Sequence, residues 1–386
     1  MDSEKTVPAE LADRAALSLI AADLGFFSNL TFNPRLEPIR SVAFLALMPF
    51  LSAFVSESAA YVKQSDLDVD RELRSHEELL RTSRLRLKLL DDSRRSFDEI
   101  LKNVVDLAAV SSGWFTDMHD GVLALLKTLI QPDLGVYFLE DDVFCTTHVA
   151  FLNVGLTEEA LSASSLSLDT LGPYLYKTAI DRGYMGLLLL SLQIDLSTFD
   201  TAPDPLPSRV QYRDLKSEHF YRSMARMVAP GRSSICLLLM SVLSQVNTAR
   251  LLVPMIAGHN EVAAFKIGFV SLFHAASSLQ SLLDQDEANP FLYSDARHRI
   301  SAAVHASPVQ GIRDSRDLRN NLVHYRISKR AASRLSPQLP LFGLVEAHVA
   351  GKTLASLTRD VGLGLHHVAV GLRGLLPRTL TPKGML

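Results

Sequence analysis

The chain has 386 residues, of which 47% are hydrophobic and 21% are charged. This is the composition of a folded globular protein, because disordered chains combine low hydrophobicity with high net charge. Basic and acidic residues number 39 and 42, a formal net charge of −3, so the chain as a whole lacks the basic field of a nucleic-acid-binding protein. Its two cysteines, Cys145 and Cys236, cannot build a disulfide framework or a four-cysteine zinc site, and we therefore expect a cytoplasmic protein.

The first 200 residues show apolar positions at helical spacing. They predict helices over 8–24, 41–60, 66–90, about 94–110, 117–130, from about 157, and 173–196. Two β-rich runs, 136–139 and 143–149, flank the acidic turn 140–142, which favours a small β-hairpin near 136–152. Short apolar runs of this kind are also compatible with buried helix, so both interpretations stay open here.

The length of the chain favours two domains. Residues 200–207, DTAPDPLP, contain three prolines in eight positions, and no helix crosses such a segment. We therefore expect an N-terminal, mainly helical domain over 1–200 and a second helical domain over 208–386.

Helical periodicity continues after this boundary. It predicts helices over 216–228, 232–256, 261–283, 294–306 and 308–334, followed by weaker helical signals in the last fifty residues. The clearest is 261–283, whose apolar residues alternate three and four positions apart. The predicted fold class is therefore all-α, with the hairpin as a small exception.

The apolar segments argue against a membrane protein. The best run, 41–55, has about 15 residues, fewer than the ~20 that a spanning helix needs. The longer run 234–257 contains Gln245, Asn247 and Arg250, which indicates a buried helix of a soluble protein. We expect no membrane association.

Residues 313–326, RDSRDLRNNLVHYR, carry the chemistry of the sequence. In a helix, Arg316, Asn320 and His324 share one side and form what we call the polar strip, with Arg319 one step around. Arginine binds phosphate oxygens through a bidentate fork, and imidazole moves protons near neutral pH. The segment 297–334 has nine basic residues and two acidic ones, a net charge of +7, as expected of an RNA or nucleotide phosphate site.

The hexapeptide RNNLVH at 319–324 resembles the signature of the HEPN superfamily, in which four to six residues separate an arginine from a histidine. The order of helices before it, a long apolar helix, a break at 289–290, a shorter helix and the motif helix, is also similar. The resemblance covers at most 209–334. It implies a HEPN-like helical bundle in the C-terminal half that dimerises and places two motif helices at one cleft.

Many HEPN proteins are metal-independent endoribonucleases of toxin–antitoxin and antiviral defence systems. The resemblance implies catalytic roles for Arg319 and His324, with Asn320 positioning the substrate. The basic residues Arg313, Arg316 and Arg326 are expected to bind RNA phosphates. It further implies RNA as substrate, a homodimer, a regulatory or antitoxin protein as a further partner, and no cofactor or metal.

Other members of the family have lost activity, so a catalytically inactive binding or scaffold protein is the alternative. We interpret His274 as a packed core residue rather than a catalytic one. Asp66, Asp68, Asp70 and Glu77 are spaced like a calcium loop, but arginine stands where that loop needs glycine, and no metal site is predicted.

Overall fold

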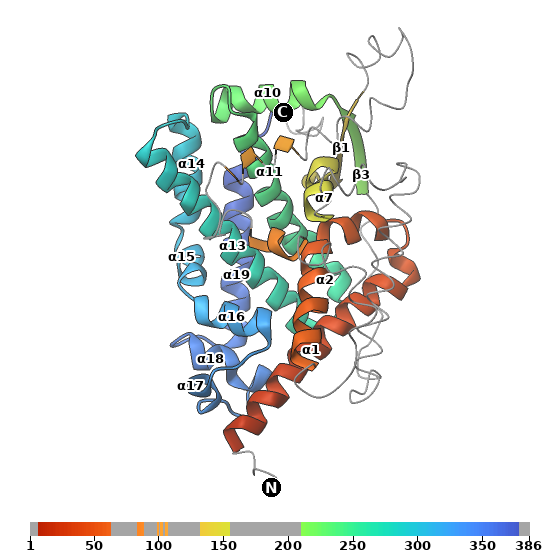
Figure 1. The fold of residues 1–386 in the computed structure, drawn as a ribbon, viewed down its shortest axis with the longest axis vertical. Helices are drawn as coiled ribbons and strands as arrows, with labels where there is room; N and C mark the ends of the chain where they lie inside the picture. The colour runs from red at the N-terminus through yellow and green to blue at the C-terminus, as the bar shows by residue number, and fades with distance from the viewer. Residues whose placement is uncertain are drawn as a thin grey trace.

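The computed structural model describes residues 7–62, 83–88, 99, 101–102, 105–106, 132–154 and 210–377. Long helices form most of this part of the chain, with a small sheet on one side of them (Figure 1). The mainly helical fold class is thus confirmed. Several predicted features lie outside the described residues, apart from isolated positions. They are the helices over 94–110, 117–130, from 157 and over 173–196, most of the helix over 66–90, and the boundary 200–207.

Two long helices, α1 (Val7–Phe32) and α2 (Arg40–Val62), pack against each other and are joined by the short 3₁₀ helix η1 (Pro34–Leu36). The side chain of Asn33 accepts a hydrogen bond from the backbone N–H of Arg35, and Pro34 takes the first helical position, where no N–H is needed. The helix α1 therefore ends just before Pro34 and runs on to Phe32, rather than stopping at residue 24 as predicted.

The predicted hairpin is present as β1 (Leu134–Leu139) and β2 (Asp142–Thr146). Its turn residues Glu140 and Asp141 have φ of 50° and 66°, the left-handed conformation that tight hairpins require. A third strand, β3 (Val210–Leu215), which the sequence analysis did not predict, pairs antiparallel with the other edge of β1 and gives the order β2-β1-β3.

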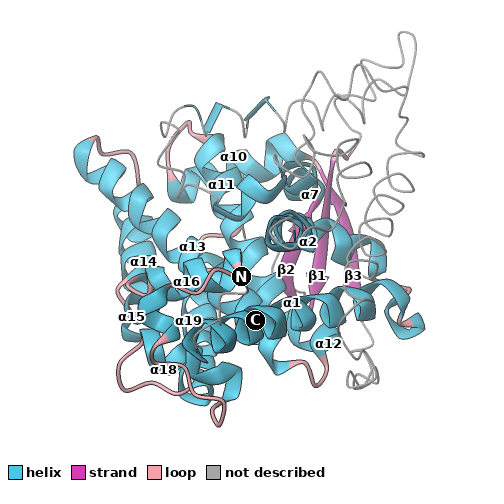
Figure 2. Ribbon diagram, turned by 60° about the horizontal axis from the view of Figure 1, so that its bottom comes forward, coloured by secondary structure: helices cyan, strands magenta, loops and turns pink. Residues whose placement is uncertain are grey.

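The predicted strand over 143–149 is wrong beyond Thr146, because helix α7 (Thr147–Val154) begins there. The hydroxyl of Thr146 accepts a hydrogen bond from the N–H of Val149 at 3.1 Å, which satisfies one of the free donors of the first helical turn. Figure 2 shows the three strands beside α2 and α7.

The C-terminal half is a continuous series of helices. They are α10 (Ser217–Val228), α11 (Ser233–Asn247), the π-helical turn η6 (Thr248–Leu252), α12 (Val253–Ala257), α13 (Glu261–Ala288), α14 (Ser294–Val304), α15 (Ser307–Arg313), α16 (Arg316–His324), α17 (Lys329–Ala332), η7 (Pro340–Gly343), α18 (Leu344–His348) and α19 (Leu354–Arg373).

The single helix predicted over 308–334 is in fact three helices, α15, α16 and α17. After α16 the chain leaves the helix because Tyr325 adopts the left-handed conformation, with φ of 53°. The side chain of Ser328 then caps the start of α17 by accepting from the N–H of Ala331. The motif helix is consequently short and begins and ends within nine residues.

Helix α13 occupies the centre of the molecule and packs against α1, α11, α14, α15, α16 and α19 (Figure 1). At its crossing with α19, Gly364 has no room for a side chain because Leu272 fills that space. Buried apolar residues of α1 and α2 join those of the C-terminal helices in one continuous core. The division into 1–200 and 208–386 stays a prediction.

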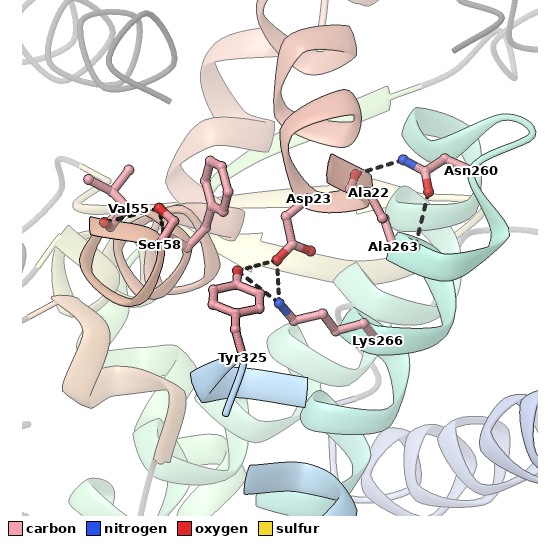
Figure 3. A network of polar contacts seen from close by, with 9 residues as sticks. Ala22, Asp23, Val55, Ser58, Asn260, Ala263, Lys266 and Tyr325 are labelled. Atoms are coloured by element: carbon pink, nitrogen blue, oxygen red, sulfur yellow. Dashed lines mark hydrogen bonds and ion pairs between the residues drawn. The ribbon is translucent and has the colours of Figure 1, made fainter. Parts of the chain in front are cut away.

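A buried polar cluster ties α1 to the C-terminal half (Figure 3). The carboxylate of Asp23 accepts from the ammonium of Lys266 on α13 and from the hydroxyl of Tyr325, the residue that follows α16. Burial lowers the pKa of Lys266 although Asp23 acts the other way, and burial together with Asp23 raises that of Tyr325. Nearby, Asn260 caps α13 and donates to the carbonyl of Ala22 at 2.7 Å.

Among the residues that the structure describes, four helices are long and apolar enough to cross a membrane by length and composition. They are Val7–Phe32, Arg40–Ser58, Ser233–Ala257 and Glu261–Ala288, whose most apolar windows are 67–83% buried inside the protein. The second helix has 19 residues, which is long enough to span a membrane. The length of the shorter apolar run over 41–55 is therefore no longer an argument against a membrane span. The expectation of no membrane stays a prediction.

Candidate functional site

Helix α16 presents the polar strip on its outer side. Leu318 and Leu322 are fully buried and anchor the helix to the core. Arg316 is exposed, and Asn320 and His324 are partly exposed. The structure therefore brings these three side chains to one face, as the helical spacing predicts.

Arg319 points inward instead. The residue is only 9% exposed. Its guanidinium nitrogens Nε and Nη2 lie 3.2 and 2.9 Å from Nε2 of His274 on α13. Because arginine only donates, Nε2 of His274 is the acceptor and carries no proton in this arrangement. The third nitrogen, Nη1, donates to Oδ1 of Asn320 at 2.9 Å.

This contact gives His274 a definite role. It is 1% exposed and holds Arg319, which in turn fixes the side chain of Asn320 in the polar strip. The guanidinium also lies 5.5 Å from the ring centre of Phe273, a cation–π contact. His274 is therefore a packed core residue, as interpreted from the sequence, and it also supports the motif helix.

His324 has a partner that the sequence analysis missed. Its Nδ1 lies 2.9 Å from Oε2 of Glu57, near the C-terminal end of α2, and the other carboxylate oxygen lies 3.0 Å from Nη1 of Arg84. The Glu57 side chain is 7% exposed and that of His324 is 35% exposed. No local sequence motif surrounds Glu57. Its contact with His324 joins segments far apart in the chain, so the sequence pattern near either residue does not predict it.

The charge of Glu57 is well compensated. Burial opposes its ionisation, but the hydrogen bond and charge of His324, together with the charges of Arg84 and Arg326, outweigh burial and lower the pKa of Glu57. Glu57 is therefore a carboxylate at neutral pH. The exposed ring of His324 stands between this buried anion and solvent.

The other predicted phosphate ligands differ in position. Arg313 lies on the preceding helix α15 and donates to Oε1 of Gln280 at 2.6 Å. Arg316 and Arg326 are exposed at the two ends of α16, and no ion pair to either occurs among the residues that the structure describes. Both are exposed cations of the basic segment.

Two features lie apart from α16. A cavity of about 640 Å³ is bounded by α10 and α11 and is lined by His148, Tyr221 and Arg226 but by none of the motif residues. Within the described parts of the chain no group of three metal-binding side chains occurs, and the calcium-like segment 66–77 lies outside them.

No family model, curated protein or solved structure matches this chain. The resemblance to the HEPN superfamily therefore depends on residues 319–324 and on their surroundings. The structure adds three observations to this resemblance. The polar strip is at least partly exposed, the buried Arg319 contacts His274, and the buried carboxylate of Glu57 contacts His324.

Proposed function

We propose that the protein is a metal-independent endoribonuclease of HEPN type whose motif helix is α16. The observation that carries the proposal is the imidazole of His324. It is partly exposed at the end of the polar strip, within a segment of net charge +7, and is hydrogen-bonded to a buried carboxylate. This is the environment in which a histidine can exchange protons with a bound phosphodiester.

In the proposed reaction, His324 accepts the proton of a ribose 2′-hydroxyl, and the 2′-oxygen attacks the adjacent phosphorus. The bond from phosphorus to the 5′-oxygen breaks, and the leaving oxygen takes up a proton. The products are a 2′,3′-cyclic phosphate and a free 5′-hydroxyl. Arg316 and Arg326 bind the phosphate oxygens and stabilise the charge that develops on them. Arg319 contributes by holding Asn320 toward the substrate.

The reaction needs a proton acceptor and a proton donor, whereas one protomer places one histidine on the polar strip. We therefore propose a homodimer in which two α16 helices border one RNA-binding cleft. A cytoplasmic location, a role in phage defence or as a toxin, and control by a regulatory or antitoxin protein belong to the same proposal.

One observation favours a second candidate, a helical protein that binds RNA or a partner without cleaving it. The guanidinium of Arg319, the motif arginine, is buried and occupied by His274 and Asn320 rather than turned to solvent. In this alternative α16 provides only phosphate binding or a dimer contact, and His324 has no chemical role.

Incubation of purified protein with mixed cellular RNA in EDTA distinguishes the two. We expect fragments with 2′,3′-cyclic phosphate ends from the parent and from a His367→Ala control, whose histidine is exposed on α19, and none from His324→Ala. Equal cleavage by His324→Ala would exclude the catalytic role. Absence of cleavage together with RNA binding that falls steeply with salt and depends on Arg316 would support the binding protein.

A further inference from the structure

We propose that Glu57 of the N-terminal half positions His324, so that α2 completes the site on α16 within the same chain. The inference rests on the proposed function of α16 and assigns a role to helices outside the part of the chain that resembles HEPN proteins. Glu57 is a positioning residue here, because it acts on the imidazole and not on the substrate.

The contact between Glu57 and His324 has a definite direction. Helix α2 packs against α16, and Figure 3 shows the turn of α2 with Val55 and Ser58 beside Tyr325, the residue after His324. Because the Glu57 side chain is 7% exposed, its carboxylate approaches His324 from the buried side. It reaches Nδ1 at 2.9 Å while a third of the imidazole side chain stays exposed.

The contact also determines which ring nitrogen of His324 carries the proton. A carboxylate only accepts hydrogen bonds, so Nδ1 of His324 carries the proton that is shared with Oε2 of Glu57. In the neutral ring the lone pair is then on Nε2, the nitrogen on the opposite edge of the imidazole. Glu57 therefore selects the tautomer whose basic nitrogen is directed away from the core, and it stabilises the imidazolium once a proton is accepted.

Glu57 is itself held by a second contact. Its other oxygen forms an ion pair with Arg84, 3.0 Å away, so each carboxylate oxygen has one cationic or proton-donating partner. A second buried carboxylate of the N-terminal half, Asp23, binds the hydroxyl of Tyr325. Two consecutive residues at the end of α16 are thus fixed by α1 and α2.

The decisive measurement is the ¹⁵N spectrum of the His324 imidazole in the full-length protein, with the signal assigned by its loss in His324→Ala. We expect the Nδ1-protonated tautomer in the parent and in the control Glu37→Gln, whose exposed side chain belongs to the residue after η1. Glu57→Leu, which cannot accept a hydrogen bond, should lose this preference. An Nε2-protonated ring in the parent would overturn the proposal.

RNA cleavage tests the same contact kinetically. Glu57→Leu should lower kcat about 100-fold, the lower part of the range for a placed acid–base group, and leave KM within about twofold. Glu57→Gln keeps an acceptor oxygen and should recover the tautomer and part of kcat. Unchanged kcat and tautomer in a folded Glu57→Leu protein would refute the role of Glu57.

The spectrum and the kinetics fail separately. If the parent cleaves no RNA, the proposed function fails, but the tautomer still tests whether Glu57 orients His324. If Glu57→Leu does not fold, the spectra of the parent and of Glu57→Gln still decide the inference, because both retain an acceptor for Nδ1.

Discussion

Acid should destabilise this protein through one buried histidine. His148 on α7 is 2% exposed and stacks on Tyr221, with ring centres 5.7 Å apart and an interplanar angle of 10°. Burial lowers the pKa of His148 from 6.5 to about 4, and the charge of Asp133 opposes the shift only in part. In the unfolded chain the same imidazole binds a proton near its ordinary pKa.

The sign follows from proton uptake. Below pH 6.5 the unfolded state binds a proton that the folded state does not take up until about pH 4, so stability is lost as the pH falls through this window. A pH of 5 lies 1.5 units below the ordinary pKa of 6.5. At this pH the free energy of unfolding is therefore lower by about 2 kcal/mol.

The assay is urea unfolding at pH 7.5 and pH 5 for the parent and for His148→Phe, which retains an aromatic ring against Tyr221. The parent should lose about 2 kcal/mol more than the variant between the two pH values. Any constant offset from the substitution cancels in this comparison, and His367→Phe serves as the exposed control. Parallel pH dependences of the parent and His148→Phe would refute the reasoning.

Three further outcomes follow from the described contacts. Asp23→Asn leaves the Lys266 ammonium buried without its carboxylate and should lower the free energy of unfolding in urea by about 3–5 kcal/mol. The apolar double variant Asp23→Leu with Lys266→Met should recover most of this loss. A double variant no more stable than Asp23→Asn would contradict the expectation. Asn260→Ala removes the cap of α13 and should cost about 1–2 kcal/mol, and a loss below 0.5 would count against the cap. Burial raises the pKa of the Cys145 thiol to about 12, so a thiol reagent at pH 8 should label Cys145 only after unfolding.

Local pattern was sufficient for the elements that are defined by their own side chains. The period of apolar residues from 261 predicts the central helix, which the structure extends to Ala288. The acidic turn at Glu140 and Asp141 marks the hairpin, and aspartate is one of the residue types that tolerate the positive φ found there. The spacing of the polar strip likewise places Arg316, Asn320 and His324 on one face.

The same pattern failed where a contact between distant segments overrides it. The periodicity over 308–334 continues through Tyr325, yet the chain turns there, with the Tyr325 hydroxyl bound to a carboxylate 302 residues away in sequence. Strand β3 was missed because its residues alternate only between exposed and partly buried, and its place is decided by pairing with β1.

The sequence by itself thus determined the helical class, the central helix, and which residues of the motif share a side of α16. Only the tertiary structure decided what surrounds them: Arg319 faces His274 from α13, and His324 faces Glu57 from α2. The physical reason is that periodicity records which face of a helix is apolar and must be buried. It carries no information on which other segment covers that face, and therefore none on the carboxylates and imidazoles that segment supplies.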